Sequence, residues 1–179
     1  MGSSKKALFI ARLSILIAFT LVMQAAALPQ PITGPLINAM LFFTESFLGM
    51  MAGVILGSVT PVVALLMGQL PAPLAPMVPF IILSNAALVV IFTLMKKINY
   101  RLKSLNQARI YIAIVAAALV KTLLLFTAIR FLLPILFGRT MKDELVLMMT
   151  TPQFVTAVVG GIIALFLLQL LKRSQIIKS

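Results

Sequence analysis

Residues 76–97 read PMVPFIILSNAALVVIFTLMKK, an apolar run that is long enough to cross a lipid bilayer and ends at Lys96 and Lys97. A helix crosses the hydrocarbon core in about 20 predominantly apolar residues. Five more segments approach this pattern, although some are barely long enough. We therefore predict an all-α integral membrane protein with six transmembrane helices, whose approximate bounds are 7–28, 32–47, 48–67, 76–95, 110–137 and 152–171. Because every connection is short, we expect a single transmembrane domain over residues 1–179.

The composition agrees with a chain that has the bilayer as its solvent. Hydrophobic residues make up 62% of the chain and charged residues 10%, whereas soluble domains are roughly half apolar and about a quarter charged. The sequence has no cysteine, no histidine and three acidic residues. It therefore offers neither the usual metal ligands nor a histidine base. We expect no catalytic residue, no metal site and no cofactor, and we expect that the protein is not an enzyme.

The positions of the cations explain the net charge of +12. Most of them fall at the N-terminus, after the fourth predicted span and at the C-terminus: Lys5, Lys6, Arg12, Lys96, Lys97, Arg101, Lys103, Arg109, Lys172, Arg173 and Lys178. Lys and Arg beside helix ends stay on the cytoplasmic side. Six spans place all three regions on that side, which predicts an N-in, C-in protein of the cell membrane. We expect a lipid bilayer around the chain and no nucleic acid partner.

The first segment has a second interpretation. Lys5 and Lys6, the apolar run 13–23 and the alanines at 25–27 also resemble a secretory signal with a small-residue cleavage site. Removal of this segment would leave five spans. The mass of the intact protein distinguishes the two interpretations.

Proline is concentrated in two of the predicted outer connections, 29–33 and 68–75, and beside them. Proline fixes φ and lacks an N–H group, so we expect stiff and partly non-helical segments. Such backbone survives at membrane depth only where it is buried in protein or lines a cavity. These connections also carry Gln30 and Gln69. They indicate a shaped pocket that faces outward, although prolines can also simply end helices.

Polar side chains within the spans are candidates for binding, because they are costly in hydrocarbon. Asn38, Asn85, Gln24 and Arg130 lie at depths from which they can reach one cavity that is open to the outside. Arg130 has no acidic neighbour at helical spacing, so an anionic group would be its attractive partner. Alternatively, Arg130 extends to the outer headgroups, and the asparagines hydrogen-bond between helices.

Two further sets of charges need partners. Glu45 and Lys121 lie at middle to inner depth, and we predict a structural ion pair between them across spans two and five. The alternative is a proton-coupled relay. Arg139 and Lys142 lie in the last outer loop and, with Arg130, favour an anionic compound, unless they are only solvated. The predicted substrate-binding residues are Asn38, Gln69, Asn85, Arg130 and Arg139.

Small residues recur at helical spacing in two stretches. The spacing of Gly49, Gly53 and Gly57 predicts a seam of close packing inside the bundle. The stripe that begins with Ala7 and Ala11 and continues through Ser14 and Ala18 has two possible roles, packing inside the fold and docking of another membrane protein.

The chain resembles the substrate-binding S components of energy-coupling factor (ECF) vitamin transporters. The resemblance is carried by the basic N-terminus with Ala7 and Ala11, the six-span plan, and residues 34–38, 49–57 and 69–85. It implies a six-helix bundle in a bacterial or archaeal plasma membrane that captures a vitamin or related nutrient from outside. It also implies that Ala7 and Ala11 dock a transmembrane T component, which a pair of ABC-type ATPases drives.

The resemblance further implies a pocket near Asn85, Arg130 and the loop 138–151. The sequence has no tryptophan, and Tyr100 and Tyr111 lie at the inner side. This argues against thiamin or riboflavin, for which aromatic stacking is expected. Metal-uptake relatives are disfavoured because His and a set of acidic residues are missing.

We therefore expect a high-affinity substrate-binding subunit of an ECF-type importer for a small, water-soluble nutrient, and the cations favour an anionic one. Two other functions stay open from the sequence: a stand-alone proton-coupled carrier and a membrane scaffold that transports nothing. The lack of a phosphate-binding GxxxxGK[ST] motif agrees with a subunit that has no ATPase of its own.

Overall fold

The computed structural model describes residues 3–98, 103–138 and 140–173, and every regular element in these ranges is helical. The predicted all-α membrane bundle is confirmed. In chain order the elements are α1 (Ser3–Ala25), α2 (Gln30–Leu48), α3 (Met50–Leu66), the 3-10 helix η1 (Ala72–Met77), α4 (Val78–Met95), α5 (Lys103–Thr127), the π-helical turn η2 (Ala128–Leu132), α6 (Leu133–Phe137), α7 (Asp143–Met148) and α8 (Thr151–Arg173).

The six predicted spans correspond to helices of unequal length and polarity. Within the ranges that the structure describes, four stretches are long and apolar enough to cross a membrane: Ser4–Ala25, Ala72–Met95, Ala108–Phe137 and Asp143–Arg173. Helix α3 is apolar but has only 17 residues. Helix α2 has 19 residues, and it is buried without a break over residues 38–42. Burial on all sides by other helices allows α2 to carry polar residues at membrane depth.

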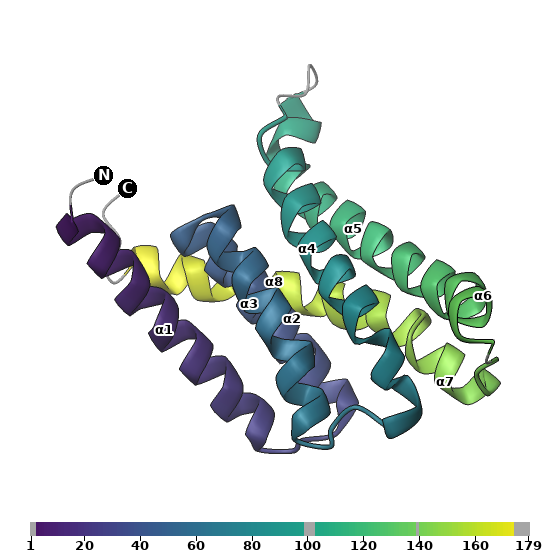
Figure 1. Ribbon diagram of the computed structural model, residues 1–179. Coiled ribbons are helices and arrows are strands. Elements are labelled where there is room, and N and C mark those ends of the chain that lie inside the picture. The colour runs from purple at the N-terminus through teal and green to yellow at the C-terminus, as the bar shows by residue number, and fades with distance from the viewer. Residues whose placement is uncertain (1–2, 99–102, 139, 174–179) are drawn as a thin grey trace.

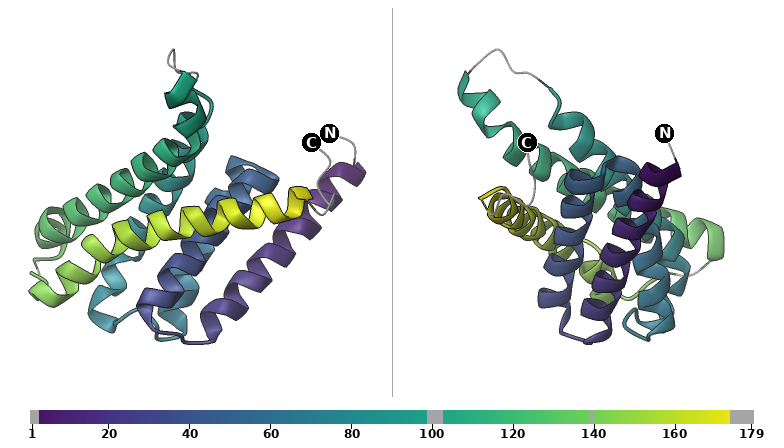
Figure 2. Two further views of the ribbon diagram at one scale, coloured as in Figure 1. Left: turned by 180° about the vertical axis from the view of Figure 1, so that it is seen from behind. Right: turned by 90° about the vertical axis from the view of Figure 1, so that its left-hand side faces the viewer.

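Helix α2 is central, and α8 crosses it on one side (Figure 1). Contacts join α2 to α1, α3, α4 and α8, and α4 packs on α5. Figure 2 shows from behind that α8 runs across the other helices. The crossing depends on Gly160, because a Cβ atom there would lie 2.6 Å from the carbonyl oxygen of Pro35. Such backbone contact is the usual result of small residues at a membrane helix interface.

The predicted glycine seam is correct at two of its three positions. A Cβ atom on Gly53 would lie 2.9 Å from Val89, and one on Gly57 would lie 3.0 Å from the Cβ atom of Asn85, so both glycines bring α3 against α4. Gly49 is different: nothing lies within 4 Å of its Cβ position, and its φ is +99°. Gly49 therefore makes the turn between α2 and α3, because L residues with a side chain rarely adopt this φ.

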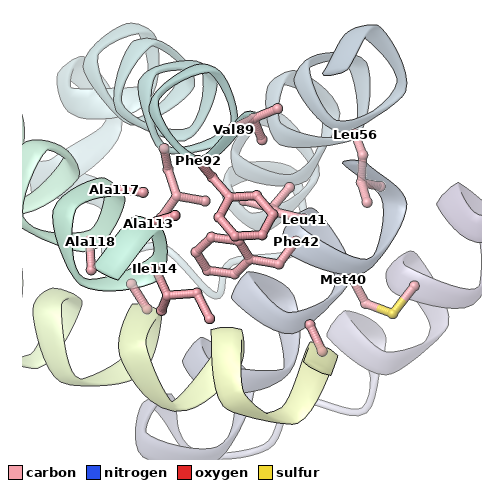
Figure 3. Packing of buried hydrophobic residues seen from close by; sticks show 13 residues of the cluster. Met40, Leu41, Phe42, Leu56, Val89, Phe92, Ala113, Ile114, Ala117 and Ala118 are labelled. Carbon is pink, nitrogen blue, oxygen red and sulfur yellow. The ribbon is translucent and has the colours of Figure 1, made fainter. Parts of the chain in front are cut away.

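The core between the helices is apolar and close-packed (Figure 3). The rings of Phe42 and Phe92 meet edge to face with centroids 4.8 Å apart, within the range that aromatic pairs prefer. Leu41, Leu56 and Ile114 fill the space around them. A second cluster joins η1 to the end of α5 and α7: Leu74, Met77, Leu125, Ala128, Ile129, Leu133 and Met149.

The start of α1 and the end of α8 lie on one side of the bundle, and the α1–α2 and α3–α4 connections lie on the other (Figure 1). The side with the start of α1 also holds the end of α4, which is followed by Lys96 and Lys97. We call this the cationic end and its opposite the loop end. The arrangement agrees with the N-in, C-in prediction, because an even number of crossings returns the chain to its starting side.

Candidate functional site

A cavity of about 130 Å³ opens at the loop end of the bundle. Helices α1 to α5 and α8 contribute to its wall, together with the α3–α4 connection and the end of α7. Its polar side chains are those of Gln24, Gln30, Thr33, Asn38, Thr60, Gln69, Asn85, Lys121 and Gln153. Three predicted binding residues, Asn38, Gln69 and Asn85, are among them. Their role in binding stays a prediction.

One wall of the cavity is built around Lys121, which is only 4% exposed. Its Nζ atom donates a hydrogen bond of 2.7 Å to Oδ1 of Asn38. The Nδ2 atom of Asn38 in turn donates to the carbonyl oxygen of Gly34 at 2.9 Å and to Oγ1 of Thr156 at 3.4 Å. Helices α2, α5 and α8 are thereby joined at one point, and an ammonium group is held against the cavity.

The predicted ion pair between Glu45 and Lys121 is wrong. Oε2 of Glu45 lies 2.6 Å from Nζ of Lys96, and its Oε1 accepts a hydrogen bond of 2.6 Å from Thr93. The physical reason is depth. Lys121 meets α2 at Asn38, which at about 1.5 Å per residue lies about 10 Å from Glu45 toward the loop end. Lys96 directly follows α4 at the cationic end, and so it reaches the carboxylate instead.

The opposite wall is organised by Pro61 in α3. Proline has no N–H group, so it leaves the carbonyl oxygen four residues earlier without a helical partner. That carbonyl belongs to Gly57, and Nδ2 of Asn85 donates to it at 2.9 Å. On the same helix, Nε2 of Gln24 donates to the carbonyl oxygen of Thr60 at 3.0 Å. Two side-chain amides from α1 and α4 are therefore fixed on the backbone of α3.

The orientation of both amides follows from their partners. A backbone carbonyl only accepts hydrogen bonds, so each amide nitrogen must point to α3 and each amide oxygen must point away. Among the described residues, Oδ1 of Asn85, Oε1 of Gln24 and Oγ1 of Thr60 are buried without a hydrogen-bond partner. Buried polar atoms are nearly always paired in folded proteins. Of the buried side-chain atoms without a partner in the described residues, all but Oγ1 of Thr44 belong to residues that line this one cavity, which makes it the candidate binding site.

The α3–α4 connection closes over this wall. Helix α3 is followed by Gly68, whose φ of +71° turns the chain. Nε2 of Gln69 then donates to the backbone oxygen of Gln24, which ties the connection to the end of α1. Leu70 and Pro71 line the cavity directly. The predicted proline-rich connection thus forms part of the pocket, while η1 packs into the apolar cluster beside it.

The predicted binding residue Arg130 does not line this cavity. Lys121 and Leu125 face the cavity, and the next position on that helical face is Ile129, which is buried. Arg130 is one residue further, within the π-helical turn η2, so it lies on a different face of the helix and its side chain is exposed. Arg139 lies outside the described residues. The cation at the cavity is Lys121, which the sequence analysis assigned to an ion pair.

A protein-family model matches almost the whole chain. The model described as the ECF transporter, substrate-specific component, matches residues 8–171. The chain belongs to this family. No curated protein and no solved structure matches the chain. This S component is thus a substrate-specific membrane subunit of ECF transporters, and the resemblance drawn from its sequence is confirmed.

The pocket of this S component has no aromatic and no acidic side chain among its described lining residues. Its apolar surface comes from aliphatic residues, including Ile37, Ala64, Ile81 and Leu125. Without a ring in the wall, stacking on an aromatic compound is not available. The described lining therefore offers aliphatic and polar contacts.

Proposed function

We propose that this S component captures a small, water-soluble nutrient in the loop-end cavity with high affinity. The positive-inside rule assigns the cationic end to the cytoplasm, so the cavity opens to the outside of the cell membrane. Import then follows docking on a transmembrane T component, and a pair of ABC-type ATPases supplies the energy. This order of events fits a family whose members are substrate-specific subunits.

One observation carries the proposal: polar side chains from separate helices converge on one cavity within an otherwise apolar bundle. Each of these groups is costly at membrane depth. Asn38, Asn85 and Lys121 are all at least nine-tenths buried. Hydrogen bonds between the helices account for the amide nitrogens of Asn38, Gln24 and Asn85, but they leave the amide oxygens of Gln24 and Asn85 unpaired beside the cavity. A bound compound would account for these oxygens, whereas a scaffold that binds nothing would not.

The surface of α1 supports docking of a partner. Ala7, Ala11, Ser14 and Ala18 are all exposed, so the small-residue stripe does not pack inside this chain. Helix α1 instead attaches to the bundle through its other face, which includes the buried Leu13, Thr20 and Gln24. An exposed small-residue stripe permits the close backbone approach of a second membrane helix. We assign the stripe to the T component, as the family resemblance implies.

The test is mass spectrometry of small molecules released when the detergent-purified protein is denatured. We expect one compound in a ratio near one per chain. Protein prepared from cells grown with an excess of that compound should retain it through repeated washing. An empty protein that also fails to take up any compound from a cell extract contradicts the capture function. Uptake into vesicles by this chain alone would instead favour a stand-alone carrier.

A further inference from the structure

We propose that the captured compound carries a carboxylate at one end and N–H or O–H donors at the other. The carboxylate pairs with Lys121, and the donors pair with Gln24, Thr60 and Asn85. This inference rests on the proposed capture function and adds the chemical class of the substrate. It follows from the different hydrogen-bonding characters of the two walls of the cavity.

The first wall needs an acceptor. A lysine ammonium has three N–H donors, and Asn38 accepts one of them. No carboxylate pairs with Lys121 in the part of the chain that the structure describes, and no acidic side chain lines the cavity there. A buried charge without a partner is strongly unfavourable. An anionic group that enters the cavity supplies both the missing charge and the missing acceptors.

The second wall needs donors. The amide nitrogens of Gln24 and Asn85 are committed to backbone carbonyls of α3, which leaves their oxygens free. An amide oxygen can only accept a hydrogen bond. The hydroxyl of Thr60 lies on the same wall and is also without a partner. These residues are 3%, 3% and 2% exposed, so bulk solvent does not satisfy them.

The surface between the two walls favours a short aliphatic compound. Ile37, Ile81 and Leu125 line the same cavity. A carboxylate carries one negative charge, which matches the one lysine among the described lining residues, whereas a phosphate monoester carries about −1.5 to −2 at pH 7. A compound with a carboxylate at one end and amide, urea or hydroxyl donors at the other satisfies every orphaned group of the cavity. It also joins α5 and α2 to α1, α3 and α4.

The first experiment uses a mixture of water-soluble aliphatic carboxylic acids that also carry amide, urea or hydroxyl donors. Each acid is paired with its methyl ester, and the mixture includes neutral polyols and amines. Purified protein is equilibrated with this mixture, washed, and analysed for retained compounds. We expect at least one acid to be retained in preference to its ester. Lys121→Gln, which keeps a donor for Asn38, should lower retention of that acid by about tenfold or more.

Two variants serve as controls for the loss of charge. Lys121→Arg keeps a cation and should retain more of the acid than Lys121→Gln does. Lys142→Gln removes an exposed cation that does not line the cavity, and it should leave retention unchanged. Retention of an acid that is unaffected by Lys121→Gln, or preferential retention of a neutral compound or an amine, overturns the inference and leaves the capture function intact. Retention of nothing from the mixture, by a protein that also releases no compound on denaturation, overturns both.

The second experiment tests the acceptor wall with a matched pair of threonines. Thr60 and Thr44 both have a buried hydroxyl without a partner among the described residues, but only Thr60 lines the cavity. Thr60→Val should lower retention of the preferred acid by about threefold to tenfold, with thermal stability unchanged or raised. Thr44→Val should leave retention unchanged. Equal retention in Thr60→Val and wild-type protein, with both variants folded by circular dichroism, overturns the assignment of donors to this wall.

Discussion

At the scale of single residues, the site depends on a proline that removes a hydrogen bond. Pro61 leaves the carbonyl oxygen of Gly57 free, and Asn85 supplies the replacement donor. The proline and the asparagine belong to different helices, so the sequence alone does not reveal that they act together. The same hydrogen bond leaves Oδ1 as the unpaired atom of the Asn85 amide. A backbone defect in α3 thus determines the chemistry of a side chain on α4.

This dependence predicts coupling between Asn85 and Pro61. Asn85→Ala leaves the Gly57 carbonyl unpaired, and we expect it to destabilise the protein by about 1–2 kcal/mol. In a Pro61→Ala background the helix regains the missing N–H group, so the same substitution should be less harmful. Thermal unfolding of the two single variants and the double variant measures the coupling, which should be about 1 kcal/mol. Strict additivity would show that the side chain does not compensate for the proline.

The corrected partner of Glu45 predicts a second coupling. Glu45→Gln and Lys96→Gln remove the same ion pair, so their effects on stability should be non-additive, with an interaction of about 0.5–3 kcal/mol. Glu45→Gln and Lys121→Gln act at separate sites and should add to within about 0.5 kcal/mol. Unfolding of detergent-purified variants measures both cycles. Coupling of Glu45 to Lys121 instead would restore the ion pair predicted from the sequence.

At the scale of elements, the helices could be predicted from the sequence much better than their faces. Apolar length identified the long spans, and the concentration of cations identified one end of the bundle. The choice of Asn38 and Asn85 followed from depth and that of Gln69 from the proline-rich connection, and all three line the cavity. The depth of Arg130 did not predict whether it lines the cavity, because neighbouring residues of a helix lie on different faces and Arg130 lies on an exposed one. Depth also gave the wrong partner for Lys121, because the partner of a buried charge depends on how the helices cross.

The crossing of α2 and α8 gives a prediction for two neighbouring glycines. A Cβ atom on Gly160 would lie 2.6 Å from the backbone oxygen of Pro35, whereas one on Gly161 would lie 2.5 Å from the side chain of Ile114. Backbone moves less easily than a side chain. Gly160→Ala should therefore lower the free energy of unfolding by about 1–3 kcal/mol more than Gly161→Ala does. It should also weaken retention of the captured compound, since Asn38 and Thr156 meet at this crossing. Equal melting temperatures of the Gly160→Ala and Gly161→Ala variants would mean that α8 can move away from α2 at little cost.

At the scale of the whole molecule, the position of the charges and the position of the cavity imply one orientation. The chain has no cysteine, so single cysteines report their side without further changes. Ala26→Cys, in the exposed α1–α2 connection, should react with a membrane-impermeant thiol reagent in intact cells. Lys97→Cys, at the cationic end, should react only after the membrane is opened. The reverse pattern would place the cavity in the cytoplasm and contradict capture from outside.

Capture and docking occupy different parts of the molecule, and this separation gives the last prediction. The stripe with Ala7 and Ala11 is exposed on α1, while the cavity receives only Gln24 from that helix. Leu in place of Ala7 or Ala11 fills the stripe and should prevent close approach of a partner helix. We expect such variants to lose most of the T component in co-purification but to keep their bound compound. Val159→Leu, exposed on α8, is the matched control and should lose neither. Loss of the compound together with the partner would mean that α1 supports the cavity directly, and undiminished co-purification would move the docking surface to another helix.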